Sequence, residues 1–179
     1  MALIVEDGSV VTGADSFLSL ADARLLAVNY GITLPVDDLE AEITLRKGYQ
    51  QLLTKERGLQ GERVSADQTG IYPRNNVLKN CFEVASNTIP NEVKMAQLYS
   101  ADGINSGATT NSVNTGEKLK SFTVSGVYSE TYQGGAVSSS NAQIQGVNNQ
   151  LYPLTKAGLA ASNCGTGSGT YRQNMGFLG

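Results

Sequence analysis

The sequence predicts a mainly α protein, with a small helical bundle body, a short β element and a long extended C-terminal arm. Charge and glycine divide the 179 residues at the same place. Of the 20 glycines, 7 lie in 1–102 and 13 in 103–179. Of 13 basic and 16 acidic residues, the only ones beyond position 102 are Glu117, Lys118, Lys120, Glu130, Lys156 and Arg172. We therefore expect a helical body over 1–106, a β-strand or hairpin insertion over 107–134 and an extended arm over 135–179.

The first elements follow from short local patterns. The apolar run at 3–5, closed by Asp7-Gly8, predicts a strand. Ser16 or Ser19 is placed to cap a helix that Gly31 ends. The apolar face predicted for this helix consists of Leu18, Ala21, Leu25 and Val28.

A second helix begins near Asp37 and Asp38, where negative charge suits a helix N-terminus, and runs to about Arg57. Its apolar residues cover about half the helix, which indicates packing on more than one neighbour. Arg46 lies in this apolar arc, four residues after Glu42. An intramolecular ion pair between them is favoured, and an exposed inter-subunit contact is the alternative.

A loop region is expected over 60–87, with a short helix around 77–84. Pro90 and Glu92 then suit the first turn of a third helix that runs to Gly103. Alternating residues predict a strand over 119–128, with a bulge at Gly126.

Beyond Gly135 the chain is rich in Ser, Asn, Gln and Gly, so we expect it to order only on a partner. Its sparse apolar residues suit anchors for grooves on another chain, although an unstructured tail would have the same composition. These anchors are Tyr152, Leu154, Tyr171, Phe177 and Leu178.

Composition argues against several classes of function. A net charge of −3 and a pI near 4.9 argue against DNA as the main partner. The chain has no His, the commonest general acid–base and metal ligand, and no pairing of a nucleophile with a base. We therefore expect no enzyme, cofactor or metal. The carboxylates at 37–42 suit a helix N-terminus, and the Gly-rich run at 164–169 suits a linker.

The two cysteines and the N-terminal residues bear on location. Cys81 and Cys164 form no CxxC motif, so we expect two reduced thiols, with a disulfide left open. No signal peptide or membrane span is recognisable, which predicts a protein kept in the host cytoplasm until assembly.

The cations could instead serve a nucleic acid. Lys118 and Lys120 lie on one face of the predicted strand. Arg74, Lys79 and Lys94 could form a basic patch, with Tyr72 and Tyr99 to stack on bases. Scattered solvated charge is the simpler interpretation.

Four motifs resemble a family of phage proteins labelled DnaT-like single-stranded-DNA-binding proteins. The opening 31 residues are similar to that family's start, and Leu45-Arg46-Lys47-Gly48-Tyr49 to its second helix. Tyr72-Pro73-Arg74 resembles its aromatic-Pro-Arg turn, and the motif at 89–94 its third-helix entry. The strand at 119–128 and the apolar segment 151–159 fall where the family has a strand and a final short helix.

Despite that label, such proteins resemble head-completion and head-to-tail connector proteins. The resemblance implies a structural virion protein in the phage neck, an adaptor ring of twelve copies that binds the portal and the tail-side proteins. It also allows contact with genomic DNA in the channel and involves no membrane. A single-stranded-DNA-binding replication accessory is the alternative. The residues predicted to contact neighbouring subunits or the portal are Arg46, Arg74, Tyr152, Leu154, Tyr171, Arg172, Phe177 and Leu178.

Overall fold

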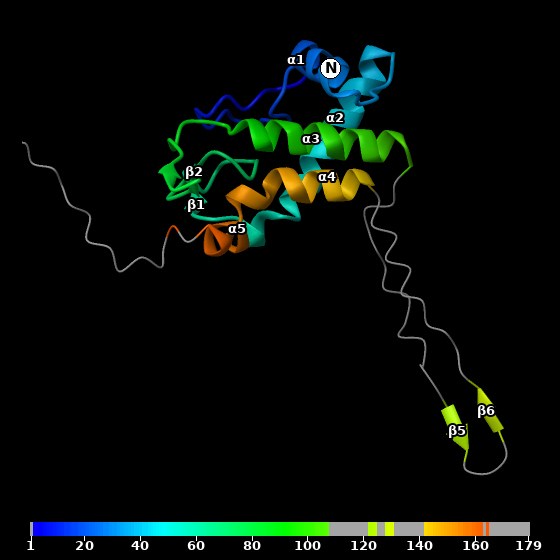
Figure 1. Ribbon diagram of the computed structural model, residues 1–179. Coiled ribbons are helices and arrows are strands. Elements are labelled where there is room, and N and C mark those ends of the chain that lie inside the picture. The colour runs from blue at the N-terminus through cyan, green and yellow to red at the C-terminus, as the bar shows by residue number, and fades with distance from the viewer. Residues whose placement is uncertain (1, 108–121, 125–127, 131–141, 163, 165–179) are drawn as a thin grey trace, which may run out of the picture.

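The computed structural model describes residues 2–107, 122–124, 128–130, 142–162 and 164 (Figure 1). The helices are α1 (Leu20–Tyr30), α2 (Asp38–Leu53), α3 (Asn91–Asn105), α4 (Ala142–Leu151) and α5 (Lys156–Ala161), with the short 3-10 turns η1 (Glu56–Gly58) and η2 (Tyr152–Leu154). The strands are β1 (Glu62–Arg63), β2 (Arg74–Asn75), β3 (Leu78–Lys79), β4 (Phe82–Glu83), β5 (Phe122–Val124) and β6 (Tyr128–Glu130), paired β1–β2, β3–β4 and β5–β6, all antiparallel. The prediction of a mainly α fold with a short β element is confirmed.

Helix α3 is the central element of the body, because α2 and α4 both pack along it (Figure 1). One core cluster joins Phe17, Tyr49 and Leu52 to Val93 and Leu154. A second cluster lies between α1, α2 and α3. Tyr99 contacts both clusters, so the two form one continuous interior. Within the described part of the chain, no helix has the length and apolar character that a membrane crossing needs.

The ends of α1 confirm the capping signals, but its buried face differs from the prediction. Ser19 is the N-cap, and Gly31 ends the helix in the left-handed conformation at φ 65°. The side chains buried on α1 are Ala23 and Ala27, whereas Leu25 is 62% exposed and Val28 82% exposed. Small residues on the inner face let α1 lie close to the body, while Leu25 and Val28 face outward.

The other N-terminal predictions need two corrections. Residues 3–5 form no strand: Val5 makes a single bridge to Ser16, and Ile4 is 46% exposed. Helix α2 ends at Leu53, four residues before the predicted end, because η1 follows it. Helix α2 does pack on two sides as predicted, with Leu45 in one core cluster and Tyr49 in the other.

The segment between η1 and α3 contains strand pairs and not the helix predicted at 77–84. Asn80 and Cys81 have positive φ values of 51° and 67°, which close the tight turn between β3 and β4. Helix α3 begins after Pro90, which is its N-cap, and continues through Gly103 to Asn105.

The chain beyond residue 135 is not an extended arm throughout, because residues 142–162 belong to the body. Helix α4 packs against α3, and Val147, Leu151 and Leu154 are buried in the core. Few apolar residues suffice here because each is nearly fully buried. Residues 165–179 and the predicted bulge at Gly126 lie outside the described residues.

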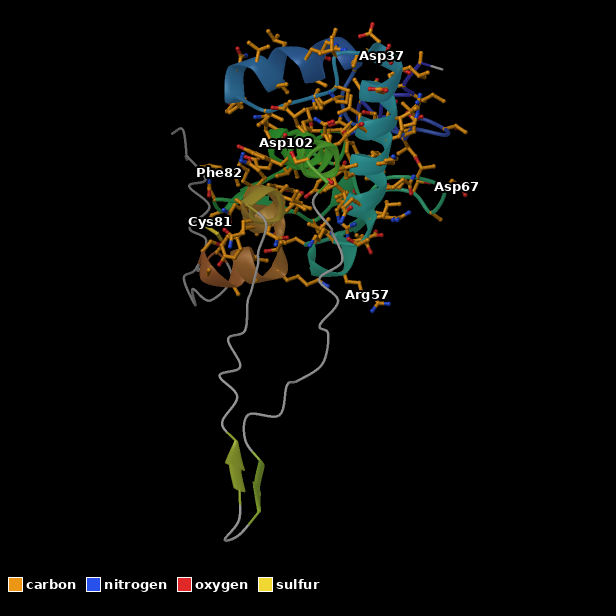
Figure 2. All side chains as sticks on the ribbon, turned by 90° about the vertical axis from the view of Figure 1, so that its right-hand side faces the viewer. Asp37, Arg57, Asp67, Cys81, Phe82 and Asp102 are labelled. Atoms are coloured by element: carbon orange, nitrogen blue, oxygen red, sulfur yellow. A yellow bond between two sulfur atoms is a disulfide. The ribbon has the colours of Figure 1, made fainter. Side chains whose placement is uncertain are left out.

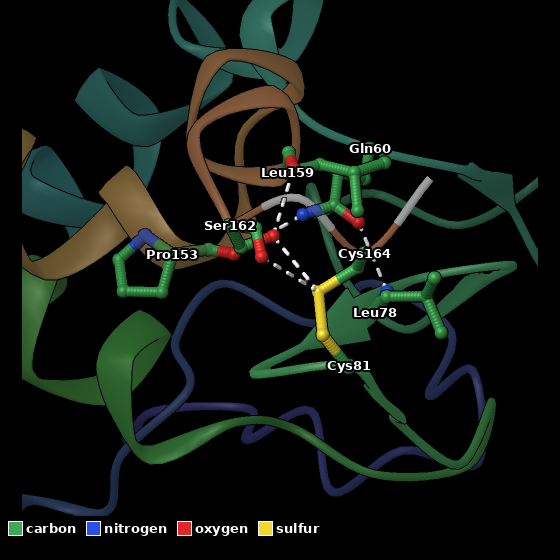
Figure 3. The surroundings of a disulfide bond; sticks show 7 residues. All are labelled: Gln60, Leu78, Cys81, Pro153, Leu159, Ser162 and Cys164. Atoms are coloured by element: carbon green, nitrogen blue, oxygen red, sulfur yellow. Dashed lines mark hydrogen bonds between the residues drawn. A yellow bond between two sulfur atoms is a disulfide. The ribbon is translucent and has the colours of Figure 1, made fainter. Parts of the chain in front are cut away.

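A disulfide joins Cys81, in the β3–β4 turn, to Cys164, just after α5 (Figure 3). The expectation of two reduced thiols was therefore wrong. The Gln60 side chain ties the same region together: its amide donates to the carbonyls of Pro153 and Thr155, and its oxygen accepts from the backbone N–H of Leu78.

Candidate nucleic-acid interface

Half of the described cations are held by carboxylates. Arg24 pairs with Asp38, Arg46 with Asp15 and Glu42, and Lys79 with Glu92, while Arg63 and Arg74 share Glu56. In the described ranges, the cations without a carboxylate within 4.0 Å are Lys47, Lys55, Arg57, Lys94 and Lys156. The positive charge available to an anionic ligand is therefore concentrated in few places.

Three of these cations come together at one end of the body, which we call the cationic end (Lys55, Arg57 and Lys156). Lys156 Nζ donates to the Arg57 carbonyl at 3.2 Å, although the two residues are 99 positions apart. A backbone bridge between Leu59 and Thr155 aligns the two segments. Figure 2 shows Arg57 at the lower edge of the body, pointing away from it, with α5 along the same edge.

Glu56, the carboxylate between Lys55 and Arg57 in the chain, is already neutralised. Arg63 donates to both oxygens of Glu56, at 2.6 and 2.7 Å, and Arg74 adds a contact of 3.2 Å. The Arg63 hydrogen bonds, with a smaller contribution from Arg74, lower the pKa of Glu56. Glu56 therefore does not cancel the charge of the neighbouring Lys55 and Arg57.

An exposed aromatic residue, Tyr152, lies in η2, the 3-10 turn that directly precedes the helix of Lys156. Tyr152 is 50% exposed and stands four residues before Lys156. Its backbone carbonyl accepts from both the N–H and the hydroxyl of Thr155, at 3.0 and 2.7 Å. Gly158 approaches the same carbonyl so closely that a Cβ there would lie 2.0 Å from it. The backbone that carries Tyr152 is therefore fixed, while part of its ring remains open to a ligand.

A shallow depression of about 500 Å³ lies between α2 and α3, and it is a poorer candidate. It is lined by Ile43, Arg46, Lys47, Gln50, Gln51 and Ile104. Arg46 is engaged by Asp15 at 2.6 Å, and no aromatic residue lines the depression. It offers one available cation and no ring for stacking.

The residues predicted as contacts are not brought together. Arg46 is held in the predicted intramolecular pair with Glu42, at 3.7 Å, besides its closer pair with Asp15. Arg74 is 5% exposed, and Leu154 is fully buried in the core. Tyr152 alone is both described and at least half exposed. Tyr171, Arg172, Phe177 and Leu178 lie outside the described residues, as do Lys118 and Lys120.

The residues suggested for base stacking and the basic patch are also placed differently. Tyr72 is fully buried, and this burial raises the pKa of its hydroxyl. Tyr99 is half-buried against both core clusters, so neither ring is a platform for a base. Of the patch at Arg74, Lys79 and Lys94, the first is buried and the second is paired. Sequence reasoning missed the cationic end because it does not show which cations lack a partner.

The acidic cluster at 37–42 has the structural role expected of it. Asp37 caps α2 by accepting from the backbone N–H of Glu40 at 3.0 Å, and Asp38 pairs with Arg24. No group of three potential metal ligands occurs among the residues that the structure places.

Fold and surface together define a small helical domain with cations and an aromatic ring exposed at one end. A family model described as "Putative DnaT-like ssDNA binding protein" matches residues 1–172, and the chain belongs to this family. No curated protein and no solved structure matches the chain.

The family match corrects the connector interpretation. It favours the alternative of single-stranded-DNA binding and indicates no phage head-to-tail connector or adaptor family. The portal, the tail-side proteins and the ring of twelve copies have no support from it. These expectations rested on a likeness between this family and head-to-tail connector proteins. The family match over 1–172 gives no support to that likeness.

Proposed function

We propose that this protein binds single-stranded DNA through the cationic end and the ring of Tyr152. The observation that carries the proposal is the gathering of three cations without carboxylate partners at one end of the body, with the exposed Tyr152 in the turn that precedes the helix of Lys156. Proteins that bind single strands combine a positive surface for the backbone with aromatic rings on which bases stack. The protein acts as a binding protein without catalysis, and the virion location stays a prediction.

The acidic composition is compatible with this role because binding depends on local charge. Each phosphate contact releases counterions, and affinity for a single strand falls with salt by a slope of about −0.7 per contact. Three contacts, from Lys55, Arg57 and Lys156, predict a slope of about −2 in log K against log salt. The distant carboxylates are screened beyond about 10 Å at 0.1 M salt.

The test is a fluorescence-anisotropy titration of a labelled oligothymidylate at several salt concentrations. We expect Arg57→Ala and Lys156→Ala each to lower the salt slope by about 0.7. Tyr152→Ala should weaken binding by about tenfold at constant slope, since stacking contributes about 1–3 kcal/mol per base.

Lys47→Ala is the matched control, because it removes an exposed, unpaired cation on α2, away from the cationic end. It should leave both affinity and slope close to those of the wild type. Equal losses from Lys47→Ala and Arg57→Ala would show that net charge and not this surface controls binding. Absence of binding by the wild type at low salt would refute the function.

A further inference from the structure

The Cys81–Cys164 disulfide connects the cationic end to a second exposed ring. Cys81 immediately precedes Phe82, which is 78% exposed at the start of β4. Cys164 follows α5, the helix that begins with Lys156. Figure 2 shows α5 between the turn with Cys81 and Phe82 on one side and Arg57 on the other. The disulfide is thus a covalent link between an aromatic and a cationic part of one surface.

Phe82 is presented in a way that suits stacking. It lies directly across the β3–β4 pair from Lys79, whose ammonium is held by Glu92. Successive side chains in a strand point to opposite faces, so Glu83 is directed away from the face that carries Phe82. A base on Phe82 therefore meets a paired lysine on that face and not the Glu83 carboxylate.

The disulfide holds the C-terminal end of helix α5. It has six residues, and Gly158 is its one buried residue. An isolated helix of this length is not stable in water. At its start, the Thr155 side chain caps the helix, and the Lys156 ammonium donates to the Arg57 carbonyl. At its other end, Ser162 contacts the Cys164 sulfur, which is bonded to Cys81 (Figure 3).

We propose that the Cys81–Cys164 disulfide aligns Phe82 and α5 as one strand-binding surface, so that binding single-stranded DNA depends on the thiol oxidation state. This rests on the proposed function. A dithiol reductant gives two electrons and two protons, the S–S bond breaks, two S–H bonds form, and the dithiol closes to its own cyclic disulfide. Helix α5 then loses its anchor at Cys164, and Lys156 and Phe82 no longer contact one strand together.

The experiment compares the oxidised and the dithiothreitol-reduced full chain in oligothymidylate titrations, with free thiols counted before each titration. We expect reduction to weaken binding by about tenfold, the loss of about one stacking contact, and reoxidation to restore it. Hydrogen exchange at residues 156–162 should rise on reduction while exchange in α3 stays unchanged. Phe82→Ala should weaken the oxidised protein and leave the reduced protein unaffected.

The double variant Cys81→Ser/Cys164→Ser is the control for the reductant. It should bind as weakly as the reduced wild type and show no response to dithiothreitol. Equal binding by oxidised and reduced wild type overturns the redox dependence and leaves the proposed function intact. If neither the oxidised nor the reduced protein binds the oligothymidylate, the proposed function and its redox dependence are both overturned. Increased hydrogen exchange at residues 156–162 on reduction would in that case still confirm that the disulfide anchors α5.

Discussion

Replacing Arg74 by Met should be among the most damaging single changes in the body. Arg74 is 5% exposed, and its guanidinium donates to the carbonyls of Gln60 and Gly61 at 2.7 and 2.8 Å. It also contacts Glu56 at 3.2 Å and the Ile71 carbonyl at 3.3 Å. These acceptors lie in η1, in the two residues before β1 and in the loop before β2, so one side chain joins three segments.

The size of the effect follows from these bonds. Met keeps most of the apolar stem of Arg, so cavity formation contributes little. Hydrogen bonds to charged groups contribute about 1.5–3 kcal/mol each, and two of those of Arg74 are short. Glu56 keeps its two bonds to Arg63, so the loss falls mainly on the Gln60 and Gly61 carbonyls, which lose their charged donor. We therefore expect the free energy of unfolding to fall by about 3–5 kcal/mol.

Urea denaturation followed by circular dichroism measures this loss. Arg24→Met is the matched control, since its Asp38 partner has a side chain 77% exposed. Exposed pairs contribute about 0–1 kcal/mol, so the control should be nearly neutral. If Arg74→Met is as mild as Arg24→Met, the idea that Arg74 holds this region together is wrong.

Three further changes test other parts of the structure. Gly48→Ala should lower the free energy of unfolding by about 1–3 kcal/mol in a thermal melt, because the added Cβ would lie 2.9 Å from the Gln97 carbonyl of α3. A stabilised variant would contradict the close packing of α2 on α3. Leu154→Ala should cost about 2–5 kcal/mol in urea unfolding, whereas Leu25→Ala should cost less than about 0.5; equal costs would contradict their burial. The ion pairs with Arg63 and Arg74 lower the pKa of Glu56 below its ordinary value, so they stabilise the fold near neutral pH and are lost as the pH falls through the lowered pKa. The difference in unfolding free energy between wild type and Glu56→Gln should therefore narrow in acid, and a constant difference would argue against the pair.

Local signals in the sequence placed both ends of α1 and the start of α2, whereas the end of α2 and the long-range contacts could not be predicted from it. Ser19, one of two predicted candidates, and Gly31 cap α1, and Asp37 lies at the N-terminus of α2 as predicted, since such signals involve only a few adjacent residues. The buried face of α1 was wrong because the apolar pattern of Leu25 and Val28 is real, yet the core takes the opposite face. Amphipathic spacing identifies a helix, while close packing selects the side that is buried.

The candidate site was only partly predictable for a related reason. Tyr152 stood out as an aromatic residue in a polar segment, and the structure leaves its ring half exposed. The importance of Arg57 and Lys156 depends on a contact across 99 positions and on Arg63 neutralising Glu56. Neither relationship has a periodic signature, and the same holds for the pairing of Cys81 with Cys164.

Helices α3 and α4 form a hairpin, and the core they build does not depend on the length of the segment that connects them. Both helices pack along each other, and Gly146 of α4 lies so near the Tyr99 ring that a Cβ would be 2.9 Å from it. The residues that close the core, Val147 and Leu151, come after the connection. Because closing a longer loop costs only about 0.6 kcal/mol for each doubling of length, the body can carry connections of very different length and sequence there. The hairpin is therefore a natural place for relatives to diverge, or for a foreign segment to be inserted, without loss of the fold.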